Sequence, residues 1–331
     1  MLLNKVEEIV VKLNRKNPFK DNKPGRHWFD AFCRRHDNIS TRICQNLTTS
    51  RLSATETALR GWFKEVDNHI DPLKLKNINP NRIYNLDESA FFLIPKGEKV
   101  LARKGSKAVY KVVHGDDKES LTVLFTVAAN GVILPPMILF WYERIPSSIA
   151  RNLPREWIAG TTEKGWMTAD CFFKYISGQF YPWLIKNKIE FPVILYVDGH
   201  SSYITLELCQ FCREHKIEVI ALYPNATHII QPLDVSVFSP LKKQYRKQVD
   251  SFRLQNNGER MARHNFAQVL KDCLDSIENL PQMIKNGFAI TGLFPFSPDS
   301  VDYNILNKMP KSIKNSFIAK NLPSQEDSLM E

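Results

Sequence analysis

Three aspartates in this sequence stand where a strand-like segment ends or a helix-like segment begins. Asp87 follows the segment 82–86, and Asp198 follows the strongly apolar segment 191–197. Asp234 stands just before a stretch with helical spacing of apolar residues. A carboxylate beside a buried segment is costly to desolvate unless it is paired or binds a cation. Three such carboxylates that converge would hold divalent metal ions, and those ions support displacement reactions at phosphodiesters.

Magnesium suits this set of residues for a chemical reason. It prefers oxygen ligands and takes one or two carboxylates per ion, so that water and phosphate oxygens complete its coordination. Two ions about 4 Å apart activate an attacking hydroxyl and stabilise the leaving oxygen of an in-line displacement. We therefore expect two Mg²⁺ or Mn²⁺ ions on the three aspartates. No glycine-rich phosphate loop, Gly-x-Ser-x-Gly elbow or His/Cys cluster in the sequence competes with them.

Each aspartate also has a structural interpretation that needs no metal. Asp198 fits a turn residue, Asp234 fits the N-cap of the following helix, and Asp87 fits a partner for a nearby lysine. Taken singly, these interpretations stay open. Taken together, they explain the three residues less well than one shared site does.

The composition is that of a globular protein with excess positive charge. The 331 residues are 43% apolar and 24% charged, and 45 Lys and Arg against 35 Asp and Glu give a net charge of +10. This length accommodates a large domain with a smaller one. A positive balance favours a polyanionic partner such as nucleic acid. Charge that serves solubility alone is the other interpretation.

Cysteine usage and hydropathy argue against several classes of protein. The six cysteines are scattered, which indicates reduced thiols in the cytosol or nucleus. Cys209 and Cys212 form a C-x-x-C pair, but their helical spacing predicts that both lie on the buried face of a helix. No second pair completes a zinc site. No apolar stretch approaches the roughly 20 residues of a membrane helix, and the N-terminus lacks a signal-peptide pattern, so we expect an intracellular protein without a membrane partner.

Helical patterns fill the first 80 residues. Apolar spacing predicts helices over 5–14, 26–35 and about 53–68, with Trp28 and Phe32 in the core of the second. Basic residues surround the first two helices. The DNA-binding candidates among them are Lys23, Arg26, Arg34, Arg35, Arg42 and Arg51. We expect a small basic helical unit over 1–52 and a helical connector over 53–80.

From residue 82 onward, strand-like and helix-like segments alternate. The predicted strands are 82–86, 121–128, 132–141, 193–197 and 218–223, with a hairpin turn at Ala129-Asn130-Gly131. The predicted helices are 168–186, 204–215, a long basic helix after Pro232, 263–278 and 280–290. The long helix carries two further DNA-binding candidates, Lys242 and Lys243. Segment 193–197 is apolar on both faces, which is typical of a central covered strand, and the whole pattern predicts an α/β layered sheet.

A series of ordered motifs runs along nearly the whole chain. They include Asn85-Leu-Asp87-Glu88-Ser89, Gly131-Val-Ile-Leu-Pro-Pro-Met137, Gly165-Trp-Met167, Asp198-Gly-His-Ser-Ser202, Tyr223-Pro-Asn-Ala-Thr-His228, Gln231-Pro-Leu-Asp-Val235 and Gly292-Leu-Phe-Pro-Phe296. Together they resemble the pogo/Tigger-type transposases of the mariner superfamily, whose domesticated relatives include jerky and centromere protein B. The number and order of the matches make this resemblance stronger than any single motif.

The resemblance implies a ribonuclease H-like domain over 81–300, with a mixed sheet and helices on both faces, and a polar tail over 301–331. It places the catalytic and metal-binding acids of the family on Asp87, Asp198 and Asp234. His200 and His228 become accessory candidates for orienting phosphate or a metal-bound water, and Gln231 is a third accessory candidate. Tyr203 stands where relatives usually carry a second histidine.

The N-terminal segment resembles the second half of the centromere-protein-B type helix-turn-helix. The matching stretches are Asn17-Pro-Phe-Lys20, Pro24-Gly-Arg-His-Trp-Phe29 and Phe32-Cys-Arg-Arg-His36. This resemblance implies double-stranded DNA as the partner and the nucleus as the location, and it is compatible with a homodimer on DNA. The family normally has a preceding helix-turn-helix. We expect that this sequence starts too late to contain it, as a truncated copy, a fragment of a gene model or a protein that has lost the module.

Three functions therefore remain from the sequence. The complete set of aspartates favours metal-dependent DNA strand cleavage and transfer. The half helix-turn-helix and Tyr203 favour a domesticated nuclear DNA-binding protein without nuclease activity. A protein-interaction scaffold without affinity for nucleic acid is the third, and the net charge of +10 argues against it.

Overall fold

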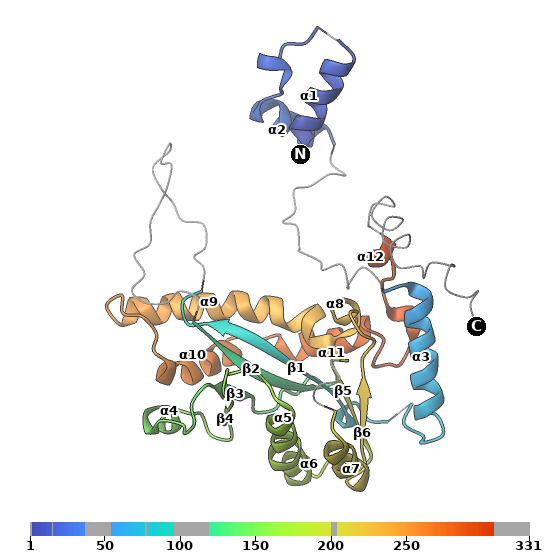
Figure 1. Cartoon of the computed structure of the whole chain (residues 1–331), viewed down its shortest axis with the longest axis vertical. Helices are drawn as coiled ribbons and strands as arrows, with labels where there is room; N and C mark the ends of the chain where they lie inside the picture. Colours follow the sequence, from blue (N-terminus) through green and yellow to red (C-terminus); the bar gives the residue numbers. More distant parts are fainter. Residues whose placement is uncertain are drawn as a thin grey trace, which may run out of the picture. The chain divides into compact units, whose positions relative to one another are not determined.

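The computed structural model describes residues 2–14, 16–36, 54–76, 78–95, 119–199 and 204–307. The sequence-based candidates Arg42, Arg51 and His200, and also Tyr203, lie outside these ranges. The chain divides into two compact units, Met1–Thr48 and Thr49–Glu331 (Figure 1). The domain limits expected at residues 52, 80 and 300 stay predictions.

The first unit contains the two helices that the apolar spacing predicts. They are α1 (Leu2–Lys12) and α2 (Arg26–Arg35), with a short 3₁₀ turn, η1 (Lys20–Asn22), between them. The Trp28 ring lies 6.0 Å from the Phe19 ring and 5.2 Å from the Phe32 ring. No residue of either helix is fully buried. The core expected around Trp28 is therefore a half-buried aromatic cluster, because two short helices do not enclose it.

The described part of the second unit is built on a six-stranded mixed sheet in the order β4-β3-β2-β1-β5-β6. The strands are β1 (Ile83–Phe92), β2 (Ser120–Ala128), β3 (Met137–Phe140), β4 (Ile158–Thr161), β5 (Val193–Val197) and β6 (Ile217–Ala221). β2 is antiparallel to its neighbours β1 and β3, whereas β1 with β5, β5 with β6 and β3 with β4 are parallel pairs. The carboxyl ends of β1, β5 and β6 therefore point to the same edge of the sheet.

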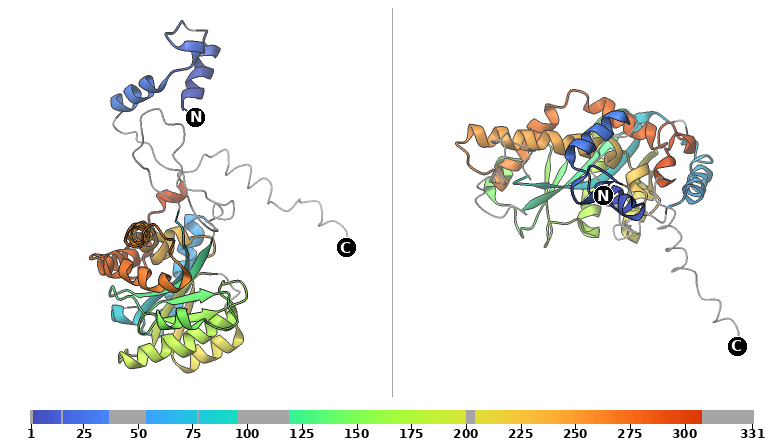
Figure 2. Two further views of the ribbon diagram at one scale, coloured as in Figure 1. Left: turned by 90° about the vertical axis from the view of Figure 1, so that its left-hand side faces the viewer. Right: turned by 90° about the horizontal axis from the view of Figure 1, so that it is seen from above.

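Helices lie on both faces of this sheet. The described helices of this unit are α3 (Glu56–Ile70), α4 (Ser147–Arg151), α5 (Ala169–Tyr175), α6 (Tyr181–Lys186), α7 (Leu206–Glu214), α8 (Thr227–Ile230), α9 (Phe238–Gln255), α10 (Arg263–Asp275), α11 (Leu280–Ile290) and α12 (Asn304–Asn307). Two π-helical turns, η4 (Ile176–Phe180) and η6 (Leu233–Val237), lead into α6 and α9. Figure 1 shows α9, α10 and α11 on one face and α5, α6 and α7 on the other, and the left view of Figure 2 shows the same layers from the side.

Alternate residues of the strands enter two separate cores. Ile83, Phe91 and Tyr196 pack with the helices α3, α9, α10 and α11. Tyr84 and Leu195 pack on the opposite face with α5, α6 and α7. Since successive strand side chains point to opposite faces, odd-numbered residues of β1 share the first face with η6. This parity places Asp87 on the side of the sheet where Asp234 lies.

Helix α3 packs into the first of these cores. Leu59 and Phe63 are buried there, and the Trp62 ring donates a hydrogen bond from Nε1 to the Ala221 carbonyl oxygen at 3.1 Å. Thr55 caps the helix by accepting a hydrogen bond from the Ala58 backbone N–H. The segment expected as a connector is thus part of the large unit and covers the end of β6.

Two predicted strands need correction, and one further strand was not predicted. β1 continues to Phe92 instead of ending at Leu86, because its antiparallel pairing with β2 extends to Phe92 opposite Ser120. β3 is limited to Met137–Phe140 because Pro135 and Pro136 lack the N–H groups that a longer ladder needs. β4 was not predicted, since its four residues show no alternation. The hairpin turn is confirmed, with Gly131 at φ 96° and its N–H donating to the Ala128 carbonyl oxygen.

The C-x-x-C prediction is half right. Cys212 is buried, but Cys209 is exposed on the same helix, because α7 turns a narrower apolar stripe toward the sheet than the spacing suggested. Among the described residues, no helix has the length and apolar character that crossing a membrane requires.

Candidate active site

Asp87 and Asp198 are brought together by the parallel pairing of β1 with β5. The register pairs Leu86 with Val197, so the next residue on each side is one of the two aspartates. Parallel neighbours lie about 4.8 Å apart. Asp87 itself is inside β1, not at its tip as predicted, and only 9% exposed. Asp198 follows the last residue of β5, whose five residues are all buried, and is half-buried.

Gly199, the residue after Asp198, lies against the backbone at the end of β6. A β-carbon on Gly199 would come 2.4 Å from the Leu222 carbonyl oxygen. Any larger residue would have to move the backbone there. The glycine therefore allows β5 to end beside β6 while its last acid stays at the sheet edge.

Asp234 comes from a helical turn above the same face. It lies within η6, so it belongs to the first turn of the helical segment and is not the residue just before it, as expected. The segment starts at Pro232, whose ring suits a first helical turn. Asp234 is exposed, whereas its neighbour Leu233 is fully buried. Leu233 anchors the turn, and Asp234 projects from it.

Asp87 interacts electrostatically with each of the other nearby acids, Asp234, Glu88 and Asp198. Burial raises the pKa of Asp87 well above its usual value, and the charges of Asp234, Glu88 and Asp198 raise it further, while the Glu88 backbone N–H lowers it. That N–H donates to Asp87 Oδ1 at 2.8 Å. A buried carboxyl surrounded by acids favours a proton or a cation.

Glu88 is a fourth carboxyl in the same region. Burial raises the pKa of Glu88 to about 7, with its own backbone N–H acting in the opposite direction and the Asp198 charge adding a smaller increase. Its Oε1 is buried and makes no hydrogen bond. Side-chain alternation along β1 points Glu88 to the face opposite Asp87. The two acids therefore approach Asp198 from different sides of the sheet.

The carboxylates are neighbours but do not form a closed ligand set. Among the described residues, no group of three or more His, Cys, Asp or Glu side chains is arranged to hold a metal ion. Carboxylates without a cation between them repel one another. The donor chemistry, oxygen ligands on two adjacent strands and one helical turn, nevertheless matches what Mg²⁺ and Mn²⁺ take from proteins.

A basic hollow begins at Asp234. Its volume is about 730 Å³, and it is lined by Asp234, Phe238, Ser239, Pro240, Lys242, Lys243 and Arg246. The Lys242 ammonium lies 5.9 Å from the centre of the Phe91 ring. Burial lowers the pKa of Lys242, and the charges of Asp234 and Asp87 act in the opposite direction. The N-terminal half of α9 therefore sets three cations beside the acids, in an arrangement suited to phosphate.

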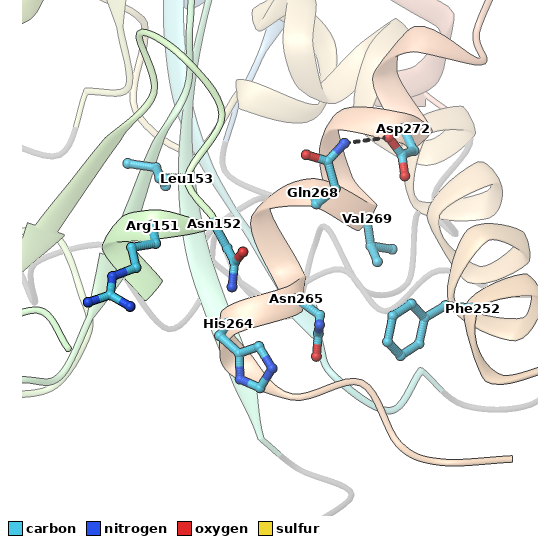
Figure 3. Close-up of a pocket in the computed structure, with 9 residues that line it drawn as sticks. All are labelled: Arg151, Asn152, Leu153, Phe252, His264, Asn265, Gln268, Val269 and Asp272. Carbon is cyan, nitrogen blue, oxygen red and sulfur yellow. Dashed lines mark hydrogen bonds between the residues drawn. The ribbon is translucent and has the colours of Figure 1, made fainter. Parts of the chain in front are cut away.

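Two further cavities lie away from the three acids. One of about 330 Å³ lies between the 151–153 segment, α9 and α10 (Figure 3), where Gln268 donates to Asp272 at 2.7 Å. The other, of about 850 Å³, includes Trp141, Tyr142 and the exposed Trp166 in its lining. Neither is lined by Asp87, Asp198 or Asp234, whereas the hollow on α9 is lined by Asp234.

More than half of the chain matches a known protein family. A profile described as DDE superfamily endonuclease matches residues 118–288, more than half of the chain, and includes both Asp198 and Asp234. The chain belongs to the DDE superfamily endonuclease family. The family expected from the motifs is thereby confirmed at this level.

A solved structure has the same fold as this DDE endonuclease-family protein. The crystal structure of the Mos1 strand transfer complex has a TM-score of 0.52 at 10% sequence identity, covering 91% of this chain and 78% of that chain. The Mos1 transposase paired-end complex with left transposon end has a TM-score of 0.48 at 10% identity, covering 86% and 76%. The first similarity confirms the predicted ribonuclease H-like fold.

One curated relative is similar in sequence to this DDE endonuclease-family chain. It is "MFS-type transporter clz9" of Cochliobolus lunatus, 25% identical over 242 residues, which is 69% of this chain and 25% of the relative. The chain thus spans about a quarter of the length of that relative.

The accessory candidates have different positions in this DDE endonuclease-family structure. His228 is half-buried in α8. Gln231 is 1% exposed, and neither its Oε1 nor its Nε2 makes a hydrogen bond within the described structure. Of the N-terminal candidates, Arg26, Arg34 and Arg35 are exposed on α2, while Lys23 forms an ion pair with Glu7 at 3.3 Å.

Sequence reasoning missed residues that place the acids without being acids. Asn85 is completely buried in β1 and bonds to two other elements. Gly287 lets α11 approach η6. Asn85 had a signal in the sequence, since it is an amide inside an apolar segment, but its partners are far away along the chain.

Proposed function

We propose that this protein cleaves DNA strands and transfers them, as a transposase of the pogo/Tigger type, with Asp87, Asp198 and Asp234 as the catalytic acids. The observation that carries the proposal is the β1–β5 register, which sets Asp87 beside Asp198 on the face where η6 presents Asp234. The similarity to Mos1 complexes and the pogo/Tigger motifs support it. Double-stranded DNA is the proposed partner, the nucleus the proposed location, and a homodimer on DNA the proposed assembly.

The three aspartates would hold two Mg²⁺ or Mn²⁺ ions. Such ions supply an activated hydroxyl and stabilise the leaving oxygen of a phosphodiester. Asp87 contributes a buried carboxyl whose charge is unfavourable without a cation. Asp198 and Asp234 contribute carboxyls that are more accessible. This division gives one acid that anchors the ions and two that face solvent and substrate.

The cations of α9 would hold the DNA strand beside the acids. Lys242, Lys243 and Arg246 line the same hollow as Asp234. Contacts to phosphate fix the register of DNA without reading its sequence. We infer that this face of α9 aligns the backbone of the strand to be cut, while α2 of the first unit adds sequence-independent contacts from Arg26, Arg34 and Arg35.

The test uses purified protein, supercoiled plasmid and Mg²⁺ or Mn²⁺. Wild type is expected to produce nicked and linear DNA, and chelation by EDTA is expected to stop it. Asp198→Ala and Asp234→Ala should each remove the activity while leaving DNA binding in place. Nicking by wild type that does not exceed that of Asp198→Ala would contradict the enzyme proposal.

A DNA-binding protein without nuclease activity is the second candidate. The observation that favours it is the absence, among the described residues, of a gathered metal-binding group. It predicts salt-dependent duplex binding by wild type with no metal-dependent nicking. The same plasmid experiment, combined with a binding titration, therefore separates the two functions.

A further inference from the structure

Asn85 connects the three chain segments that carry the acids. It lies on β1 two residues before Asp87, and its Nδ2 donates to the Tyr196 carbonyl oxygen at 3.1 Å. Tyr196 stands two residues before Asp198 on β5. The Asn85 Oδ1 accepts from the Leu233 backbone N–H at 3.2 Å, and Leu233 immediately precedes Asp234. One side chain is thus bonded to the backbone two residues before Asp198 and to the backbone one residue before Asp234.

The burial of the Asn85 amide costs free energy unless its hydrogen bonds are satisfied. Asn85 is 0% exposed, and its neighbours on the same face of β1 and β5 include the apolar residues Ile83 and Ile194. A buried amide must satisfy its hydrogen bonds or lose free energy. An aliphatic residue would fill the site without that requirement. Both polar ends of Asn85 are satisfied, and both partners are backbone groups of other elements.

The bond to Leu233 fixes the height of η6 above the sheet. The four N-terminal N–H groups of a helix lack partners within the helix, and Asn85 supplies one for Leu233. From the other side, Ser236 Oγ donates to the Met283 carbonyl oxygen of α11 at 2.7 Å. The turn that carries Asp234 is therefore held both by the sheet and by α11.

We propose that Asn85 is a positioning residue that sets the separation of the metal-binding carboxylates. It holds the backbone before Asp234 against the strands that carry Asp87 and Asp198, so that bound ions meet all three acids with little rearrangement. Groups behind the ligands change metal affinity or activity by roughly 10–100-fold when they are removed. The inference rests on the proposed function, since it concerns the same acids.

The test compares Asn85→Leu with a matched control, Thr126→Val. Thr126 is also 0% exposed in this sheet and bonds through Oγ1 to the Tyr175 hydroxyl at 2.7 Å, but that bond joins no two acid-bearing segments. Each variant removes buried side-chain hydrogen bonding from the core, so both are expected to unfold at lower temperature than wild type. Only Asn85→Leu should change how the protein uses metal.

Mn²⁺ binding to the purified proteins is measured by calorimetry, and plasmid nicking is measured over a series of Mn²⁺ concentrations. For Asn85→Leu we expect half-saturation by Mn²⁺ and half-maximal nicking to move to about 10-fold higher concentration or more, with DNA binding unchanged. For Thr126→Val both should match wild type. Asn85→Ser retains one hydrogen-bonding group and should fall between wild type and Asn85→Leu, which provides the measurement if the leucine variant does not fold.

The outcomes separate this proposal from the proposed function. If wild type binds and uses Mn²⁺ and the Asn85 variants do so as well as Thr126→Val does, Asn85 has only a structural role and the positioning proposal is wrong. If wild type neither binds Mn²⁺ nor nicks DNA, the proposed function fails, and the role of Asn85 fails with it.

Discussion

Gly287 of α11 lies directly against Pro232, the residue at which the helical segment carrying Asp234 begins. A β-carbon at position 287 would come 2.9 Å from the Pro232 carbonyl oxygen and 2.5 Å from Ser236 Oγ. The serine hydroxyl can rotate away, but the Pro232 carbonyl belongs to the backbone. The separation of α11 from η6 is thus set by the absence of a side chain at position 287.

Gly287→Ala is expected to displace η6 and lower stability. Overpacking of a filled core costs about 1–3 kcal/mol, and the displacement should also reduce DNA nicking because Asp234 moves with the turn. Gly61→Ala is the matched control, since Gly61 is also in a helix and nothing lies within 4 Å of its added β-carbon. That control should gain up to about 1 kcal/mol from helix propensity. Urea unfolding measures both, and equal stabilisation of the two variants would contradict the tight contact.

Asp87→Asn is expected to stabilise the protein when metal is absent. The raised pKa of Asp87 means that its charge opposes folding near neutral pH, and every tenfold change in proton affinity on folding corresponds to about 1.4 kcal/mol. The asparagine keeps an oxygen for the Glu88 N–H. Unfolding in EDTA at pH 8 should therefore require more urea than wild type. In contrast, Mn²⁺ should raise the melting temperature of wild type and not that of the variant.

The stability of the metal-free protein should fall as pH rises. An acid whose pKa is raised in the folded state binds its proton more tightly there than in the unfolded state. Its contribution to stability is therefore complete at pH values below the unfolded-state pKa, and it is lost as the pH rises to the folded-state pKa. For Glu88 this window runs from a pKa of 4.5 to about 7. Urea unfolding curves in EDTA across that range give the slope of the unfolding free energy against pH. The Glu88→Gln substitution should reduce this slope. A wild-type protein that gains stability between these pH values would argue against buried acids.

The basic hollow predicts which lysines and arginines bind DNA. Lys243 and Arg246 are exposed and line the hollow with Asp234, whereas Lys247 is exposed on the same helix but does not line it. Removing a phosphate contact lowers the slope of log affinity against log salt by about 1. Lys243→Ala and Arg246→Ala should each weaken duplex binding and lower that slope. Lys247→Ala should leave it near wild type, and an equal effect of all three would indicate only bulk charge.

Thiol reactivity should separate the two cysteines of the C-x-x-C pair. Burial raises the pKa of Cys212 to about 12 and of Cys171 to about 11, whereas Cys209 is exposed. Because the thiolate is the reactive form, iodoacetamide should modify Cys209 well before Cys212 in the native protein. Peptide mass spectrometry reads the sites, and urea should abolish the difference. Equal native labelling would show that α7 is turned differently.

Local patterns in the sequence were sufficient for most elements of the fold. Alternating or continuous apolar residues identified the strands 121–128 and 193–197, and helical spacing identified α9, α10 and α11. These patterns are readable because backbone geometry imposes a period on neighbouring residues. The continuation of β1 past Asp87 could not be predicted from the sequence. The acidic and small residues there belong to the strand because they pair with β2.

By itself the sequence determined which acids are available, the order of the elements that carry them and the family to which the chain belongs. Only the tertiary structure decided that Asp87 and Asp198 are adjacent, that Asp234 faces the same side of the sheet, and that Asn85 bonds to both of the other segments. The reason is physical: Asn85 and Tyr196 are 111 positions apart along the chain. Their contact depends on how whole strands pair and which face each helix covers, and no local period encodes that.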